Sequence, residues 1–319
     1  RLTEHTGKCL YGECPVCRTG RHVLPLKINN YKHMKIKMTG ASGYLGSKIS
    51  GELKKQGHDV FPISRNLLYG STDALKEELN GAHALINLAG APILQRWTKK
   101  NKKEIYDSRV ETSRNLANAL REMAPGNRPG KILAASAIGI FSPGKTHDEA
   151  STDFEKGFVG KVVYDWEASW NDLPDDLSVT VFRLPPVLGK EAQTIQKMFL
   201  PFKLGLGGKI GSGKQPFPFI HEKDVARAFR WALENEDVNG VFNLVAPQKI
   251  TNQDFTRAFA KALNRPAFLA IPEFALKLLF GKAASMLTHS PQIESKRLPQ
   301  AGFELNYSTI DEVMEEIFR

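Results

Sequence analysis

The chain has 319 residues, of which 41% are hydrophobic and 24% charged; these proportions are typical of a folded soluble protein and exclude disorder of the whole chain. No apolar run approaches the roughly 18 residues that a membrane-spanning helix needs, and we therefore expect no membrane partner. The formal net charge is +10, but it is spread along the chain, and the densest basic run, 99–103, is typical of a solvated helix face, so we expect no nucleic-acid partner.

Residues 1–33 show no amphipathic periodicity, and a regular pattern begins at Met34. We interpret them as a leader or extension outside the fold, either an upstream segment or part of a targeting signal. Cys14 and Cys17 form a pair with the spacing of zinc ligands, and they could bind zinc together with Cys9 and either His5 or His22. A zinc site normally has two such pairs, and only one is present. The body of the chain has no cysteine, and no metal site is predicted there. A reducing, cytoplasmic location fits, and organellar import stays open because the leader is basic.

From residue 34 onward, short apolar strands alternate with amphipathic helices. Strands are predicted at 35–38, 58–64, 83–88, 131–136 and 178–184, and helices at 44–56, 102–123 and 160–171. Such alternation predicts a parallel sheet with helices on both faces, the doubly wound (Rossmann) α/β architecture. We assign residues 34–190 to this domain.

After residue 190 the alternation weakens, and glycine, proline and phenylalanine accumulate through 205–219. Helices are predicted at 222–234 and 252–263, with a strand at 240–244 between them. We interpret 191–270 as a substrate-side region with elements that return to the Rossmann core. Residues 271–319 are predicted to form a small, mostly helical C-terminal domain ending in a helix at 309–318.

A glycine loop follows the first predicted strand, where Gly40, Gly43 and Gly46 lead into a helix. In this setting the first glycine permits a tight turn, the second lets the backbone approach a pyrophosphate, and the third allows close helix packing. The loop therefore predicts a dinucleotide site in the 34–190 domain. The other contacts assigned to the loop are Ser42, Tyr44 and Leu45.

The second predicted strand ends at Arg65, where an Asp or Glu would bind the adenosine ribose of NAD. No acid occurs between Phe61 and Thr72, and a guanidinium can instead pair with a 2′-phosphate. The sequence therefore predicts NADP as the cofactor. A turn of small residues after the next strand would pass close to the adenine ribose, and its predicted contacts are Asn87, Leu88, Ala89 and Gly90.

With these landmarks the chain resembles the extended short-chain dehydrogenase/reductases, and within them an atypical epimerase-like family with a small C-terminal domain of unknown role. The resemblance runs from residue 34 to the end, and its most specific part is the block 200–213 followed by 219–224, which generic reductases lack. Shorter similar segments are 108–112, 136–139, 166–167, 183–189 and 302–303. The resemblance implies the fold and dinucleotide binding, and it adds Arg109, Leu184 and Val187 to the cofactor residues. Arg109 stands where extended family members often place an active-site Asn.

In that superfamily a Ser or Thr after the fifth strand polarises a carbonyl or hydroxyl group. A Tyr four residues before a Lys moves the proton, because the Lys lowers the pKa of the phenol. Ser136 matches the first position, and Tyr164 lies in the helix that should carry the second. However, the residue four later is Ala168, preceded by Glu167, and a carboxylate would raise the pKa of a nearby phenol. Ser136 and Tyr164 are therefore the candidate catalytic residues, and a structural role stays open for each.

The segment 211–221 should cover the substrate side, where Lys214, Gln215 and His221 could contact a polar or anionic substrate. Alternatively, His221 and Asp224 anchor the loop onto the following helix.

The sequence is compatible with two functions. The first is an NADP-dependent oxidoreductase or epimerase-like enzyme acting on a small carbonyl or nucleotide-sugar-like substrate. The second is an NADP-binding sensor or interaction protein with little turnover, which the missing Lys favours. A small-molecule substrate is the expected partner, and a homodimer is an open alternative.

Overall fold

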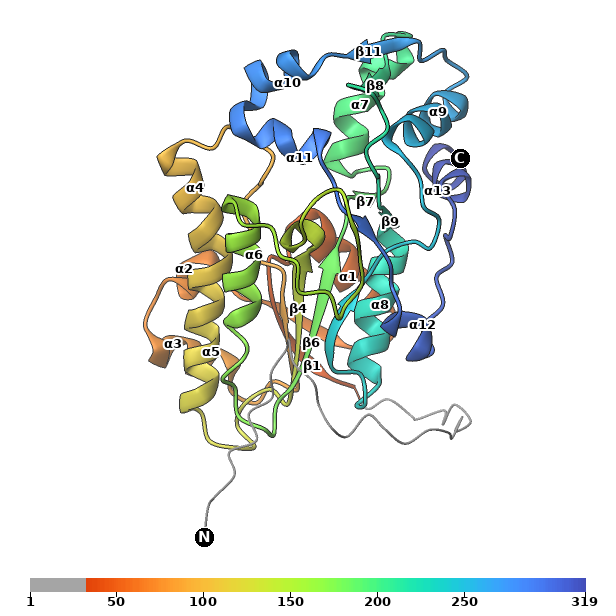
Figure 1. Ribbon diagram of the computed structural model, residues 1–319. Coiled ribbons are helices and arrows are strands. Elements are labelled where there is room, and N and C mark those ends of the chain that lie inside the picture. Colours follow the sequence, from red (N-terminus) through yellow and green to blue (C-terminus); the bar gives the residue numbers. More distant parts are fainter. Residues whose placement is uncertain (1–32) are drawn as a thin grey trace.

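The computed structural model describes residues 33–319 (Figure 1). The strands of the main sheet are β1 (Lys35–Thr39), β2 (Asp59–Pro62), β3 (Ala84–Asn87), β4 (Lys131–Ala137), β6 (Ser178–Leu184) and β10 (Gly240–Asn243). The shorter strands are β5 (Thr146–His147), β7 (Val187–Leu188), β8 (Gly208–Ile210), β9 (Ile220–His221), β11 (Leu269–Ile271) and β12 (Gln292–Ile293). The leader and its possible zinc ligands lie outside the described residues, except for His33 at their start.

The helices cover both sides of the sheet and the C-terminal part. They are α1 (Tyr44–Lys55), α2 (Arg65–Leu68), α3 (Thr72–Leu79), α4 (Lys99–Tyr106), α5 (Thr112–Glu122), α6 (Phe158–Ala168), α7 (Gln193–Lys203), α8 (Glu222–Glu234), α9 (Asn252–Ala262), α10 (Glu273–Phe280), α11 (Ser285–Thr288), α12 (Arg297–Gln300) and α13 (Ile310–Phe318). A π-helical turn, Asp107–Glu111, joins α4 to α5, and 3-10 turns lie at Ile138–Ile140 and Gly281–Ala284. Among residues 33–319, no helix has both the length and the apolar character needed to cross a membrane.

The main sheet has six strands in the order β10-β6-β4-β3-β1-β2, and every neighbouring pair is parallel. This arrangement confirms the predicted doubly wound fold. The chain passes from β1 to β2 on one side and then returns to place β3 on the other side of β1. In open α/β sheets, ligands bind beyond the carboxyl ends of the strands where the order reverses in this way. The glycine loop after β1 lies at that point.

The strand that ends near Ser136 is β4, the fourth along the chain rather than the fifth. The classic order of this architecture is 3-2-1-4-5-6. Here 65–79 forms helices α2 and α3, and no strand within residues 33–319 pairs with the outer edge of β2. The place of β4 beside β3 therefore corresponds to the fifth strand of the classic order.

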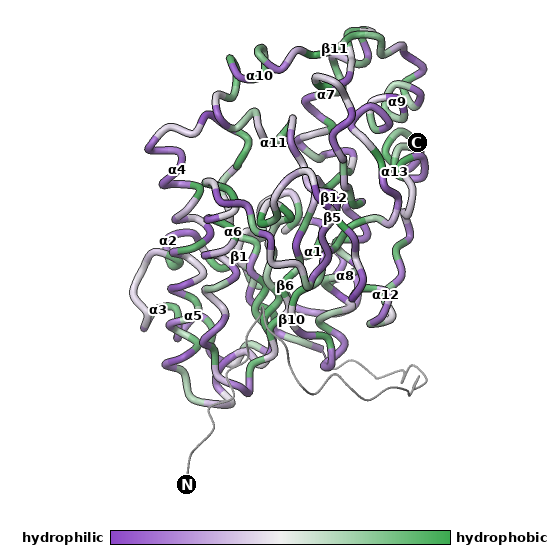
Figure 2. Tube along the Cα trace, viewed as in Figure 1, coloured by the Kyte–Doolittle hydropathy of each residue, from purple (hydrophilic) through white to green (hydrophobic). Residues whose placement is uncertain are grey.

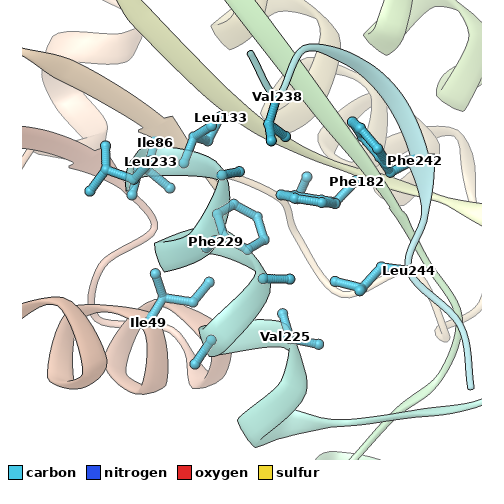
Figure 3. Packing of buried hydrophobic residues seen from close by; sticks show 14 of the residues in the cluster. Ile49, Ile86, Leu133, Phe182, Val225, Phe229, Leu233, Val238, Phe242 and Leu244 are labelled. Carbon is cyan, nitrogen blue, oxygen red and sulfur yellow. The ribbon is translucent and has the colours of Figure 1, made fainter. Parts of the chain in front are cut away.

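Successive residues of the strands point to opposite faces and build two cores. On one face, α1 and α8 pack over the sheet: Ile49 and Phe229 belong to the same buried cluster as Leu133 and Phe182, and the rings of Phe182 and Phe229 lie 4.9 Å apart (Figure 3). On the other face, α3 and α5 pack against the intervening strand residues, which are Leu85, Ile132, Val181 and Val241. Because side chains alternate along a strand, sheets buried on both faces have nearly continuous apolar strands.

Several helices differ from the sequence-based expectation; α2 was not predicted, and α6 runs from Phe158 to Ala168 rather than over 160–171. The helix predicted at 102–123 begins at Lys99 and contains the π-helical turn between α4 and α5. Helix α3 was not predicted, although Ser71 caps it and Leu75 and Leu79 form its buried face. Helix α7 was also not predicted: Pro201 lies inside it, and its apolar residues are divided between buried and exposed positions, which hides the helical period.

In Figure 1, α7, α9, α10 and the strands β8 and β11 lie at the top of the molecule, whereas α8 and α12 lie beside the main sheet. Helix α8 and strand β10 return to the main sheet, whereas α7, α9 and α13 share a separate apolar core around Phe202, Phe259 and Ile317. The short strands form the parallel pairs β8-β11, β7-β9 and β5-β12. Figure 2 shows hydrophilic residues on the outward side of α9 and hydrophobic residues along the central strands.

Candidate functional site

The glycine loop has the tight geometry that the sequence predicted. Gly40 has φ +65°, a conformation that L residues rarely adopt, and a Cβ on it would lie 2.8 Å from the Leu88 carbonyl oxygen. A Cβ on Gly46 would lie 2.1 Å from the Gly40 carbonyl oxygen. The backbone therefore folds so closely that no side chain fits at either position.

Helix α1 begins at this loop without a side-chain cap. Gly43 is its N-cap residue, the first turn has no acidic residue, and the Ser47 N–H is the donor to the Gly43 carbonyl, at 2.9 Å. The N–H groups ahead of Ser47 point out of the helix end, where the helix dipole favours an anion. Ser42 and Gly43 are exposed at this end, and Leu45 packs partly against the core. The loop thus fits a pyrophosphate.

A buried polar network holds the loop against the turn after β3. Thr39 and Asn87 are register partners on β1 and β3, and the Thr39 hydroxyl donates to Asn87 Oδ1 at 2.6 Å. Thr39 Oγ1 also accepts from the N–H groups of Leu88 and Ala89, and Asn87 Nδ2 donates to Ser113 Oγ at 2.8 Å. Asn87 therefore shapes the turn through its side chain. Thr39 and Ser113 were missed by the sequence analysis, although Thr39 directly precedes the loop.

The phenol of Tyr44 is bound within the protein. Its hydroxyl donates to Glu222 at the start of α8. Burial is the main reason that the pKa of Tyr44 is raised, and the hydrogen bond to the Glu222 carboxylate raises it further. Lys48 lies 2.8 Å from Glu191 and 3.5 Å from Glu222. A Cβ on Gly189 would lie 2.3 Å from the Tyr44 hydroxyl, so the phenol packs directly against the backbone of this glycine. This cluster fixes the first turn of α1 against α8.

Arg65 begins helix α2 directly after the N-cap Ser64. Its side chain is 69% exposed, and Nη2 lies 3.6 Å from Glu104 Oε1. Exposed ion pairs at such distances are weak, so they do not prevent the guanidinium from meeting another anion. The structure thus places a cation just beyond β2, at the edge of the sheet where the sequence analysis expected a phosphate contact.

Arg109 lies in the π-helical turn, half-buried between the turn after β3 and helix α6. A Cβ on Gly90 would lie 3.0 Å from its guanidinium carbon, and the ring of Trp166 lies 5.5 Å from that carbon. Its guanidinium donates to the Ile105 carbonyl at 3.3 Å, and within the described residues it forms no ion pair. Burial lowers the pKa of Arg109 to about 10. A cation so placed gains stability from any anion that reaches it.

Ser136 belongs to a buried triad with Glu167 and Arg183. Its hydroxyl donates to Glu167 Oε1 at 2.5 Å. Arg183 donates from Nε to Oε1 at 2.9 Å and from Nη2 to Oε2 at 2.8 Å, a bidentate pair in which both side chains are at most 1% exposed. Arg183 is the register partner of Ser136 on β6. The acid next to the expected lysine position is therefore neutralised by an arginine that the sequence analysis did not assign to the site.

Tyr164 is on α6 with 44% of its surface exposed, and its ring lies 5.8 Å from the ring of Phe154. Glu167, the acid considered near it, is bound to Ser136 and Arg183 instead. The structure thus separates the two candidates: Ser136 is inside the buried triad, whereas Tyr164 is at the surface of the helix.

The remaining candidate residues lie around the upper edge of the sheet. Leu184 ends β6 and Val187 begins β7, and both are half-buried. Gln215 donates to the carbonyls of Ile210 and Leu287, at 3.2 and 3.1 Å, and so joins its loop to α11. Lys214 is exposed.

His221 acts as the N-cap of α8, because its Nδ1 accepts from the Lys223 N–H at 3.3 Å. It is 1% exposed, its ring lies 4.1 Å from that of Tyr307, and burial lowers its pKa. Asp224 accepts from the N–H groups of Asn306 and Tyr307. The cap contact of His221 matches the anchoring alternative, whereas Asp224 fixes the segment at Asn306 and Tyr307 to α8 rather than the 211–221 loop.

Within residues 33–319, no group of three His, Cys, Asp or Glu side chains is arranged to hold a metal ion.

Two family patterns match the chain. Residues 36–244 match the pattern described as the NAD dependent epimerase/dehydratase family, and residues 271–317 match a domain of unknown function. The chain is 33% identical to mouse epimerase family protein SDR39U1 over 293 residues, which cover 89% of this chain and 99% of the mouse protein. It is 30% identical to epimerase family protein YfhF of Bacillus subtilis, covering 89% and 98% of the two chains. A relative from Arabidopsis thaliana, 27% identical over 94% of this chain and 91% of its own, is named chloroplastic.

Solved structures show the same architecture. Human epimerase family protein SDR39U1, crystallised with NADPH, superposes with a TM-score of 0.83 and 34% identity over 89% of this chain and 99% of its own. A UDP-N-acetylglucosamine 4-epimerase from Bacillus cereus superposes with a TM-score of 0.70 at 21% identity over 89% and 98% of the two chains, a likeness of fold alone.

Proposed function

The chain belongs to the NAD-dependent epimerase/dehydratase family, and we propose that it binds NADPH at the carboxyl edge of the sheet and uses it on a small carbonyl or nucleotide-sugar-like substrate. The observation that carries the proposal is the side-chain-free cradle of Gly40 and Gly46 at the uncapped start of α1. The human relative crystallised with NADPH supports the same cofactor. When bound, the nicotinamide would supply hydride chemistry.

Arg65 supports NADPH over NADH, because it is exposed, weakly paired and next to β2. We expect NADPH to bind at least about tenfold tighter than NADH, a difference of about 1.4 kcal/mol that one guanidinium–phosphate contact can supply. Fluorescence titration of both cofactors measures the ratio. Arg65→Ala should remove most of the preference, whereas Lys55→Ala, at the far end of α1, should leave it unchanged. Equal affinities in the original chain would refute the assignment of Arg65.

The protein's own proton chemistry would centre on Ser136. Its hydroxyl donates to Glu167, and to polarise a bound carbonyl the hydroxyl proton would turn from Glu167 toward the carbonyl oxygen. Arg183 holds the carboxylate in place through two hydrogen bonds. Ser136 is 3% exposed, so a substrate group that reaches it has left bulk water. Hydrogen bonds are stronger in such a water-excluded site. Arg109 is retained among the cofactor residues, as the half-buried cation beside the turn after β3.

If the site is catalytic, we expect Ser136→Ala to reduce kcat by a factor on the order of 100 without weakening NADPH binding, because one oriented group is lost from the transition state. Tyr164→Phe should cost less, because its exposed phenol has no lysine four residues later to lower its pKa. The measurement is NADPH oxidation with the best substrate from a panel of small carbonyl compounds and nucleotide sugars. A larger loss for Tyr164→Phe would contradict this view of the site.

The hydrogen bonds within the Ser136–Glu167–Arg183 triad favour a second function, that of an NADPH-binding sensor. The Ser136 proton is already donated to Glu167, and the Tyr–Lys pair of the superfamily is incomplete, an arrangement that suits a protein binding NADPH with little turnover. Tight NADPH binding without oxidation across the whole substrate panel would select this sensor function. In either case the cytoplasm stays the proposed location, and import into an organelle stays open because one relative is named chloroplastic.

A further inference from the structure

A cavity of about 520 Å³ lies between α9 and the β8-β11 pair, and it shares no lining residue with the candidate dinucleotide and active site. Its walls carry four cations, Lys209, Arg257, Lys261 and Arg265, and no Asp or Glu. The volume is within the range of small-molecule sites. The feature is therefore a basic cavity within the 191–270 region, outside the small C-terminal domain.

Three of these cations follow one another at intervals of four residues, so Arg257, Lys261 and Arg265 lie along one face of α9 and the turn after it. Like charges at this spacing repel each other, and a bound anion would relieve the repulsion. The carboxylates near them line an adjoining cavity of about 400 Å³, which contains Asp254 and Asp311.

Those carboxylates neutralise the basic cavity only in part. Lys261 is 3.1 Å from Asp311 and Arg257 is 3.9 Å from Asp254, in pairs with mostly exposed side chains, so both attractions are weak. Neither Lys209 nor Arg265 forms an ion pair within residues 33–319. An incoming anion would meet little competition for these two cations.

Thr256 points to a ligand independently of the charges. It lines the same cavity, is 2% exposed, and its Oγ1 is buried without a hydrogen-bond partner among the described residues. Most buried hydroxyl groups in proteins have a partner. Its Oγ1 is itself covered, so an acceptor oxygen in the cavity would become its partner only if this wall moved aside.

An aromatic side chain stands at the rim. Phe268 is 91% exposed and Leu269 is 49% exposed, and both line the cavity. Together they place an apolar surface next to the cations of the cavity. An exposed aromatic ring next to several cations is the combination that binds a base and its phosphates.

We propose that this cavity binds a nucleotide carrying a di- or triphosphate, separately from the NADPH site. The four cations and the Thr256 hydroxyl would hold the phosphates, and the base would lie against Phe268. The positive charge of the lining matches a polyphosphate better than a single carboxylate, and the cavity would accommodate one mononucleotide.

The test is calorimetric titration of the full chain, saturated with NADPH, with ATP and with pyrophosphate at low ionic strength. We expect one saturable site for each probe, with ATP tighter. Arg257→Gln/Arg265→Gln should raise both Kd values at least about tenfold. Phe268→Ala should weaken ATP at least about threefold and leave pyrophosphate unchanged, because only the base loses its stacking partner.

The matched control is Lys54→Gln/Lys55→Gln, which removes the same charge from the last turn of α1 and should change neither Kd. Melting temperature and NADPH affinity, measured on every variant, check that each one is folded. The proposal is overturned by the absence of a saturable signal with ATP, by equal losses in the control and cavity variants, or by competition between ATP and NADPH for one site.

Discussion

Gly46→Ala is expected to raise the Kd for NADPH at least about 100-fold, equivalent to about 2.7 kcal/mol. The added Cβ would lie 2.1 Å from the Gly40 carbonyl oxygen and 2.8 Å from the Ala41 Cα, and both are backbone atoms that cannot rotate away. The loop must move off the start of α1, and the N–H groups that face the pyrophosphate move with it. Titration of NADPH, followed by its fluorescence, measures the loss.

The same helix supplies the control. Gly51 lies in α1 with nothing within 4 Å of the position of its Cβ, so Gly51→Ala should leave NADPH affinity unchanged. It should also stabilise the helix by up to about 1 kcal/mol, because alanine has the higher helix propensity. Near-normal NADPH binding by a folded Gly46→Ala variant would show that the cofactor does not use this loop.

Arg183→Met is expected to lower the free energy of unfolding by about 3–5 kcal/mol, the usual consequence of removing one partner from a buried ion pair. Arg183 is 0% exposed, and it donates two hydrogen bonds to Glu167, which is 1% exposed. The substitution removes the counter-ion of a carboxylate that water does not reach. Urea denaturation, with unfolding followed by circular dichroism, measures the change.

Two further variants show whether the loss of stability comes from an unpaired buried charge. Glu167→Leu combined with Arg183→Leu removes both charges, and it should be less destabilising than Arg183→Met alone, because no buried charge remains. Lys145→Gln breaks the exposed pair with Asp153 and should cost at most about 1 kcal/mol. If Arg183→Met were no more destabilising than Lys145→Gln, the triad would not be a major stabilising element, and its place in the proposed chemistry would lose its support.

Strands and helices whose apolar residues are buried could be predicted from the sequence, whereas a helix with exposed apolar residues could not. Strands such as β4 and β6 are buried on both faces and stand out as apolar runs. Helix α8 has a clear buried face and was predicted with its correct ends. Helix α7 was missed because Phe199 and Leu200 are exposed, so its apolar residues do not mark one buried face.

What the sequence determined by itself is local. Glycine at 40 and 46 follows from the backbone conformation and the close packing of the loop, and the missing lysine after Tyr164 is visible in the chain. Only the tertiary structure decided which distant groups meet. Ser136 faces Arg183, and Thr39 faces Asn87, because of strand register. Register depends on how the whole sheet packs, whereas a glycine's conformational freedom belongs to the residue. The cofactor loop could therefore be found in the sequence, and the Ser136–Glu167–Arg183 triad could not.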